Sequence, residues 1–172
     1  YEEDISLGNL TLENGNIASI LGTMSLAGGS VGENGMIYLV YMSNLDLQGD
    51  LTVAGALNLG HGSSLSLAGN TLDVSGGELG IQSPQKLDGI TTDNATTLKI
   101  NQWAQAFRTD NGTTTVGNLE MVQDHNPDDN SSNHGTHFGV DNMSLIVAGN
   151  VQIEQGSIEL KNGTLTLQQT VS

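Results

Sequence analysis

The sequence contains no cysteine, and only four of its 172 residues are lysine or arginine. Without thiols the chain has no disulfide framework, no zinc–thiolate site and no cysteine nucleophile. Its 19 acidic residues bring the formal charge to −15. This charge excludes a nucleic-acid surface, because phosphate binding needs clustered Lys and Arg. It also disfavours binding to an anionic membrane surface.

Aromatic residues (3% of the chain), prolines (two residues) and long apolar runs are also scarce. The longest apolar run, residues 36–42, has the length of a strand, whereas a membrane-spanning helix needs about 20 apolar residues. Glycine is abundant, with 23 residues. The chain length suits one domain with one hydrophobic core. We therefore expect a single β domain over residues 1–172.

A short unit recurs along the chain, with two aliphatic residues separated by one residue that is mostly polar. In an extended chain such a unit points both aliphatics to one face and the middle residue to the other. Glycine and asparagine, which tolerate the backbone of sharp turns, stand between many of the units. The units lie at residues 10–12, 45–47, 51–53, 57–59, 65–67, 72–74, 79–81, 145–147, 151–153, 158–160 and 165–167.

The spacing of these units predicts the fold. Units that start at 45, 51 and 57 are followed by units at 65, 72 and 79, which is 20, 21 and 22 residues later. Three short strands per coil of about 20 residues are typical of a three-sided parallel β-solenoid. The alternative is an antiparallel β-sandwich, although its strands usually have about five to six residues.

Two parts of the chain align almost residue for residue. Leu65-Ser-Leu-Ala-Gly-Asn70 matches Leu145-Ile-Val-Ala-Gly-Asn150, and the units at 72 and 151 are each followed by another unit seven residues later. We therefore interpret residues 5–82 and 143–168 as repeat blocks, with 84–142 as an irregular insertion. Within the insertion, the four-residue spacing of Trp103 and Phe107 predicts a short helix. Residues 113–116 and 119–122 predict one or two further strands.

A stretch rich in histidine and aspartate near the end of the insertion is the first candidate site. His125, His134 and His137 are suitable ligands for Zn²⁺, and Asp124, Asp128 or Asp129 would add oxygen ligands. Calcium is a second candidate ion for so acidic a surface. The alternative is a solvated loop, because Asp, Asn, Ser and Gly also favour turns. No His-Glu-x-x-His signature of zinc hydrolases is present.

Paired carboxylates are the second candidate site. Two aspartates that share a cleft can act as general acid and base on a glycan. With 19 acidic residues, chance neighbours explain the same pattern. The catalytic candidates are Asp124, Asp128, Asp129 and Asp141, and Asp93 and Asp110 are two further aspartates of the insertion.

Two runs of the first repeat block resemble the repeats of a known class of proteins. Leu51-Thr-Val-Ala-Gly-Ala-Leu-Asn-Leu59 and Leu72-Asp-Val-Ser-Gly-Gly-Glu-Leu79 resemble the strand repeats of bacterial autotransporter passenger domains and related filamentous surface proteins. The resemblance covers the two repeat blocks, and its motifs are of low specificity. It implies a parallel β-helix that is displayed outside the cell and is often adhesive.

Three functions follow as hypotheses. The first is a secreted or cell-surface bacterial binding or adhesion module whose partner is an extracellular glycan or glycoprotein. The second is a secreted hydrolase that acts on a glycan or mucin-type glycoprotein through the Asp/His site. The third is a surface filament subunit that self-associates through the solenoid ends, whose unpaired backbone edges invite another strand. The sequence shows no signal peptide, and we expect one to have been removed.

Overall fold

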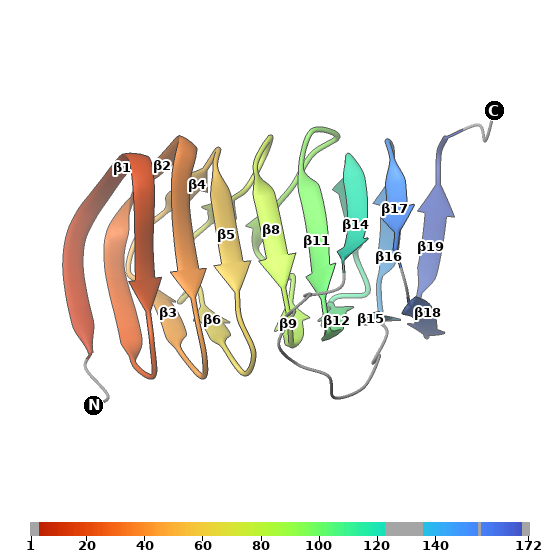
Figure 1. Cartoon of the computed structure of the whole chain (residues 1–172), viewed down its shortest axis with the longest axis horizontal. Coiled ribbons are helices and arrows are strands. Elements are labelled where there is room, and N and C mark those ends of the chain that lie inside the picture. Colours follow the sequence, from red (N-terminus) through yellow and green to blue (C-terminus); the bar gives the residue numbers. More distant parts are fainter. Residues whose placement is uncertain (1–3, 123–135, 155, 170–172) are drawn as a thin grey trace.

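The computed structural model describes residues 4–122, 136–154 and 156–169. These residues form a parallel β-solenoid, with strands stacked side by side from the N-terminal to the C-terminal end (Figure 1). Every strand pair is parallel, and the described residues contain no helix. The predicted solenoid is therefore confirmed, and the antiparallel sandwich is wrong. None of the described residues forms a helix long and apolar enough to cross a membrane.

The solenoid has three sides, and successive coils add one strand to each side. The first side contains β3 (Asn44–Leu47), β6 (Ser64–Ser66), β9 (Pro84–Lys86), β12 (Trp103–Phe107), β15 (Thr136–Asp141) and β18 (Gly156–Lys161). The second side contains β4 (Leu51–Val53), β7 (Leu72–Asp73), β10 (Ile90–Thr91), β13 (Thr113–Val116), β16 (Ser144–Val147) and β19 (Thr164–Leu167). The third side contains β5 (Ala56–Leu59), β8 (Glu78–Ile81), β11 (Thr97–Asn101), β14 (Asn118–Val122) and β17 (Val151–Ile153).

The two N-terminal strands, β1 (Ile5–Ser19) and β2 (Thr23–Leu39), are long enough to run through all three sides. β2 pairs in turn with β3, β4 and β5. The spacing predicted for the following coils is confirmed by the strand register. The paired residues are Leu45 with Leu65, Leu51 with Leu72, Leu57 with Leu79, and Leu145 with Leu165.

Ladders of aliphatic side chains fill the interior. On the third side Leu57, Leu79, Leu98 and Leu119 follow one another from coil to coil, and each is at most 1% exposed. Burying a leucine side chain of this kind stabilises the fold by about 1.5–3 kcal/mol. The stack of ladders is the hydrophobic core, which leaves the outward positions of the strands free for other roles.

The predicted helix around Trp103 is wrong. Residues 97–101 and 103–107 form β11 and β12, and Gln102 turns the corner between them with a φ of 56°. Trp103 and Phe107 do share a face, but through the two-residue alternation of a strand. The two strands expected at 113–116 and 119–122 are confirmed as β13 and β14, so the described part of 84–142 continues the coils.

Pro84 marks a break in one ladder. β9, which begins at Pro84, pairs with β12 but not with β6, so a separate four-stranded sheet starts at β9. Proline has no N–H to donate to a neighbouring strand, which explains an interruption at this position. The chain nevertheless keeps its coiled path through β10 and β11.

Candidate functional site

Two of the predicted site residues, His137 and Asp141, lie on β15 of the first side. They alternate with Phe138 and Val140, which are fully buried in the core, so both belong to the outward-facing set of this strand. Five further predicted residues lie outside the described part of the chain. These are Asp124, His125, Asp128, Asp129 and His134.

The pairing of β12, β15 and β18 brings side chains from distant parts of the sequence together (Figure 1). Neighbouring strands of a sheet lie about 4.8 Å apart, so residues in register form rows across the side. The rows are Trp103, His137 and Ser157; Gln105, Gly139 and Glu159; and Phe107, Asp141 and Lys161.

Trp103 and His137 form an aromatic pair on the outer surface. Their ring centroids are 4.9 Å apart with an interplanar angle of 34°, and Trp103 is 68% exposed. On the next strand, Ser157 Oγ lies 3.0 Å from His137 Nδ1, and Glu159 Oε2 lies 3.2 Å from Nε2. Contacts at both ring nitrogens hold the imidazole in place beside the indole.

These contacts bear on the predicted metal site. Of its candidate ligands only His137 lies in the described residues, and both nitrogens of His137 already have protein partners. Within residues 4–122, 136–154 and 156–169, no group of three His, Asp or Glu side chains is arranged to hold a metal ion. The zinc or calcium prediction thus finds no ligand set in this part of the chain.

Asp141 is buried on the same strand. It is 9% exposed, and its Oδ2 accepts a hydrogen bond of 3.0 Å from Gln105 Nε2 and lies 3.8 Å from Lys161 Nζ. The other carboxylate oxygen, Oδ1, is buried and has no hydrogen-bond partner. A buried acceptor without a donor is costly to the fold.

A groove of about 460 Å³ connects these residues along the first side, and Trp103, His137, Asp141 and Glu159 line it. Gly139 also lines it, at the outward position between Gln105 and Glu159, where any other residue would place a side chain. A Cβ atom at Gly139 would lie 3.1 Å from Gln105 Cγ. The absence of a side chain here therefore hollows the surface.

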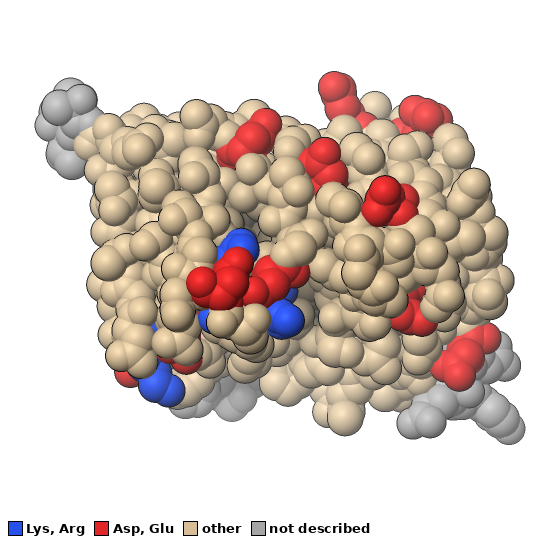
Figure 2. Space-filling view, turned by 180° about the vertical axis from the view of Figure 1, so that it is seen from behind, with Lys and Arg blue, Asp and Glu red and all other residues tan. Residues whose placement is uncertain are grey.

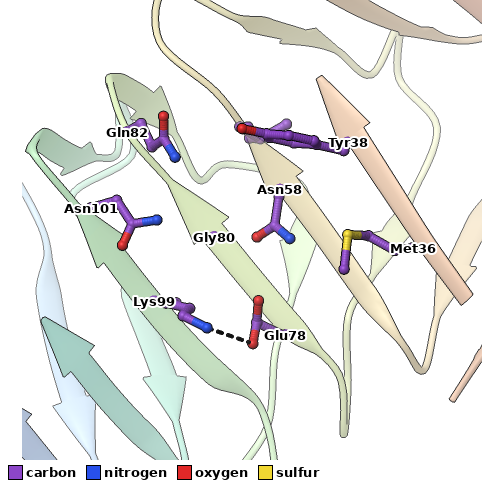
Figure 3. A pocket seen from close by; sticks show the side chains of 9 residues that line it. Met36, Tyr38, Asn58, Glu78, Gly80, Gln82, Lys99 and Asn101 are labelled. Atoms are coloured by element: carbon purple, nitrogen blue, oxygen red, sulfur yellow. Dashed lines mark ion pairs between the residues drawn. The ribbon is translucent and has the colours of Figure 1, made fainter. Parts of the chain in front are cut away.

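A second hollow, of about 200 Å³, lies on the third side (Figure 3). Gly80 is placed between Asn58 of β5 and Lys99 of β11, and a Cβ atom there would collide with the side-chain oxygen of Asn58. Tyr38 and Met36 lie on one side of this pocket in Figure 3.

The opposite wall of this pocket is polar. Gln82, Asn101 and Lys99 lie across Gly80 from Tyr38, and Lys99 Nζ forms an ion pair with Glu78 Oε2 at 3.6 Å (Figure 3). Asn101 Oδ1 is buried without a hydrogen-bond partner. In the described residues, Asn101 Oδ1 and Asp141 Oδ1 are the two buried side-chain atoms in this condition, and each belongs to a residue that lines one of the hollows.

Asp93 and Asp110, which were weighed as parts of a catalytic pair, stabilise turns instead. Burial raises the pKa of Asp93, but hydrogen bonds from Ala95, Gly76 and Thr96 outweigh it and lower the pKa below its ordinary value. The hydrogen bonds that Arg108 donates to Asp110 lower the pKa of that carboxyl strongly. A general acid near neutral pH needs a raised pKa, so neither residue suits that role.

The four basic residues of the chain all form ion pairs, and all lie between residues 86 and 161. Figure 2 shows basic and acidic side chains side by side over this part of the molecule. The pairs are Lys86 with Asp88, Lys99 with Glu78, Arg108 with Asp110, and Lys161 with Asp141. Elsewhere on the face drawn in Figure 2, acidic side chains stand without basic neighbours. The surface therefore offers no unpaired Lys or Arg to an anionic ligand.

The chain matches no family model, no curated protein and no solved structure in the comparisons with known proteins. The function must therefore be argued from the geometry of the two hollows.

Sequence reasoning missed Gln105, Glu159 and Lys161, and it used Trp103 to predict a helix rather than a site. A partial signal was present, because Glu159 and Lys161 follow Gly139 and Asp141 by one coil of 20 residues. The glycine in the unit 79–81 was a further signal, since the middle position of these units faces outward.

Proposed function

We propose that this protein is a secreted or cell-surface bacterial binding module of the β-solenoid type, and that its first-side groove binds an uncharged extracellular glycan. The observation that carries the proposal is the exposed indole of Trp103 in the same groove as Asp141, whose Oδ1 is buried without a donor. A sugar ring has an apolar face that packs on an aromatic ring and hydroxyl groups that donate to such an acceptor.

The remaining lining suits a ligand with many hydroxyl groups. Gln105, Glu159 and Gln82 add amide and carboxylate groups to the groove, and Gly139 leaves space for a ring to approach the sheet. The volume of about 460 Å³ falls within the range of small-molecule sites. A few fixed polar groups around one aromatic surface are the usual composition of such a site.

Charge narrows the class of glycan. The chain carries a formal charge of −15, and its four basic residues are paired with carboxylates. Sulfated or phosphorylated polymers would be repelled, because no unpaired cation is available to them. Uncharged sugars meet no such barrier.

The extracellular bacterial setting of this proposal is supported by composition and repeats. The chain has no cysteine and few lysines, and its Leu-x-Leu units resemble those of autotransporter passengers and filamentous surface proteins. The parallel β-solenoid fold agrees with such a repeat protein. Display outside the cell would give the open first side direct access to surrounding polysaccharides.

The test uses intrinsic fluorescence, because Trp103 is the single tryptophan of the chain. The protein is titrated with cello-, malto- and chito-oligosaccharides, and calorimetry confirms each affinity. At least one uncharged series should shift the Trp103 emission, whereas a sulfated heparin oligosaccharide should not. Calorimetry of Trp103→Ala and Asp141→Asn should show at least tenfold weaker binding, at unchanged melting temperature for Trp103→Ala.

Asp46→Asn provides the matched control. Asp46 also faces outward on the first side, on β3, and it does not line the groove. This variant should bind as the wild type does. If none of the uncharged sugars binds, or if the Asp46 variant loses as much affinity as the Asp141 variant, the proposal fails. Shorter products after incubation would replace it with the hydrolase hypothesis, and EDTA sensitivity would then indicate a metal.

A further inference from the structure

The groove on the first side and the pocket on the third side meet at one corner of the solenoid. Gln82 lines both hollows. Asn101 of the pocket and Trp103 of the groove are separated by Gln102 alone, whose positive φ of 56° turns the chain from β11 to β12. The two hollows are therefore neighbours over a single turn of the backbone.

Both hollows are built in the same way. From β3 to β19, the outward-facing glycines within the described strands are Gly80 and Gly139, and each lines one hollow. Glycine inside a strand weakens the strand and often marks a place where a ligand approaches the backbone closely. Two such glycines, placed on either side of one corner, indicate that the two hollows belong to one continuous binding surface.

Each hollow also contains one unsatisfied acceptor. Asp141 Oδ1 on the first side and Asn101 Oδ1 on the third side are buried and lack a donor. A ligand hydroxyl that reached either oxygen would supply the missing donor. The third-side pocket adds the ring of Tyr38 and the amides of Asn58 and Gln82, which can donate as well as accept (Figure 3).

We infer that the third-side pocket is a second subsite for the same ligand, so that an uncharged oligosaccharide chain passes over the corner at Gln82 with one sugar unit beside Trp103 and another beside Tyr38. This inference rests on the proposed function of the groove. It deepens that function, because it makes the ligand a chain of several units rather than a single sugar. A longer chain should bind more tightly, since its second contact is made within the same complex.

The test compares chain lengths. Affinities for the disaccharide and the hexasaccharide of the cello-, malto- and chito- series are measured by calorimetry on the wild type and on Gly80→Ala. The alanine Cβ would displace the Asn58 side chain and narrow the pocket, and Gly80 does not have the positive φ that would strain it. For the wild type we expect the hexasaccharide to bind at least tenfold more tightly, and for Gly80→Ala we expect this ratio to fall to about one.

Asn101→Ala serves as a second variant, because it removes the unsatisfied oxygen and should also reduce the ratio. Gly8→Ala is the control, since a Cβ at Gly8 meets no atom within 4 Å, and it should keep the wild-type ratio. Equal affinities for both lengths in the wild type, or a ratio that both pocket variants leave unchanged, would overturn the second subsite while the groove stands. Absence of any binding to the wild type would overturn the proposed function and this inference together.

Discussion

Two corners of the solenoid use their side chains in opposite ways. At the corner between the first and second sides, Asp88 accepts hydrogen bonds from the N–H and hydroxyl of Thr109 in the next coil, and Asp110 accepts from Arg108 and the N–H of Gly112. Asp88 therefore joins neighbouring coils, and Asp110 stabilises the turn to which it belongs. Both are structural groups, although Asp110 was among the catalytic candidates of the sequence analysis.

The corner between the third and first sides presents aromatic rings instead. Tyr41 stacks on His61 at a centroid distance of 5.8 Å and is 47% exposed, and Trp103 follows further along at 68% exposed. Exposed aromatic rings contribute little to folding stability, so they are available to a ligand. The comparison is consistent with the proposed binding surface, which lies at the corner whose side chains the fold does not need.

The largest expected effect on stability concerns glycines that pack closely against the backbone of the preceding coil, which occur at both corners. Gly60 at the aromatic corner packs on the carbonyl oxygens of Val40 and Leu39, and Gly49 at the carboxylate corner packs on the carbonyl oxygen of Ala27. An added Cβ collides with backbone in both places, so Gly60→Ala and Gly49→Ala should each cost about 3 kcal/mol of unfolding free energy. Urea denaturation measures this, with Gly8→Ala as the neutral control. If only one of the two variants lost unfolding free energy, close backbone packing would be required at that corner alone.

The second largest effect on stability is expected from a side chain at the carboxylate corner. Asp88→Ala removes the hydrogen bonds from Thr109, so we expect a loss of about 1–2 kcal/mol in unfolding free energy. Oligosaccharide affinity should stay within twofold of the wild type, because Asp88 does not line either hollow. Denaturation and calorimetry on the same preparation test both points. Weaker binding at unchanged stability would assign Asp88 to a ligand site.

Acid should weaken the carboxylate corner more than the aromatic corner. Burial raises the pKa of Asp88, but hydrogen bonds from Thr109 outweigh burial and bring the pKa below its ordinary value. A pKa that is lower in the folded chain stabilises the fold above about pH 4, and this stabilisation is lost as the pH falls through the folded value. The melting temperatures of the wild type and Asp88→Asn should therefore differ at pH 7 and converge towards pH 3. A constant difference over this range would contradict the mechanism.

The smallest effect on stability is expected at the aromatic corner. Trp103→Ala should change the unfolding free energy by less than about 0.5 kcal/mol, because the ring is largely exposed. Thermal melts followed by circular dichroism measure this, since the variant has no tryptophan fluorescence. A large loss of stability would mean that the indole is part of the scaffold and would remove the contrast between the corners.

The local pattern of the sequence predicted the coil correctly. The spacing of the Leu-x-Leu units matched the observed partners Leu45–Leu65, Leu51–Leu72 and Leu57–Leu79. This succeeded because a strand alternates its side chains every two residues, and because a coil must bring each aliphatic pair back over the one before. The helix at Trp103 failed for a related reason, since residues four apart share a face in a strand as well as in a helix.

Assigning units to sides was beyond the sequence. The block that starts at Leu65 matches the block that starts at Leu145, yet Leu65 pairs on the first side with Leu45, and Leu145 pairs on the second side with Leu165. All three sides need the same inward aliphatics, so similarity of the units does not indicate which side they occupy. Only the stacking of whole coils resolves this.

The sequence by itself determined the alternation of strands and turns, the length of the coils and the acidic surface with few cations, because these depend on residue type and short spacing. The tertiary structure alone decided which outward residues meet. It brought Trp103 beside His137, left Gly80 and Gly139 as openings in two sides, and buried Asn101 Oδ1 and Asp141 Oδ1 without partners. Such contacts depend on the register between coils, where a shift of a single residue would turn every side chain to the opposite face.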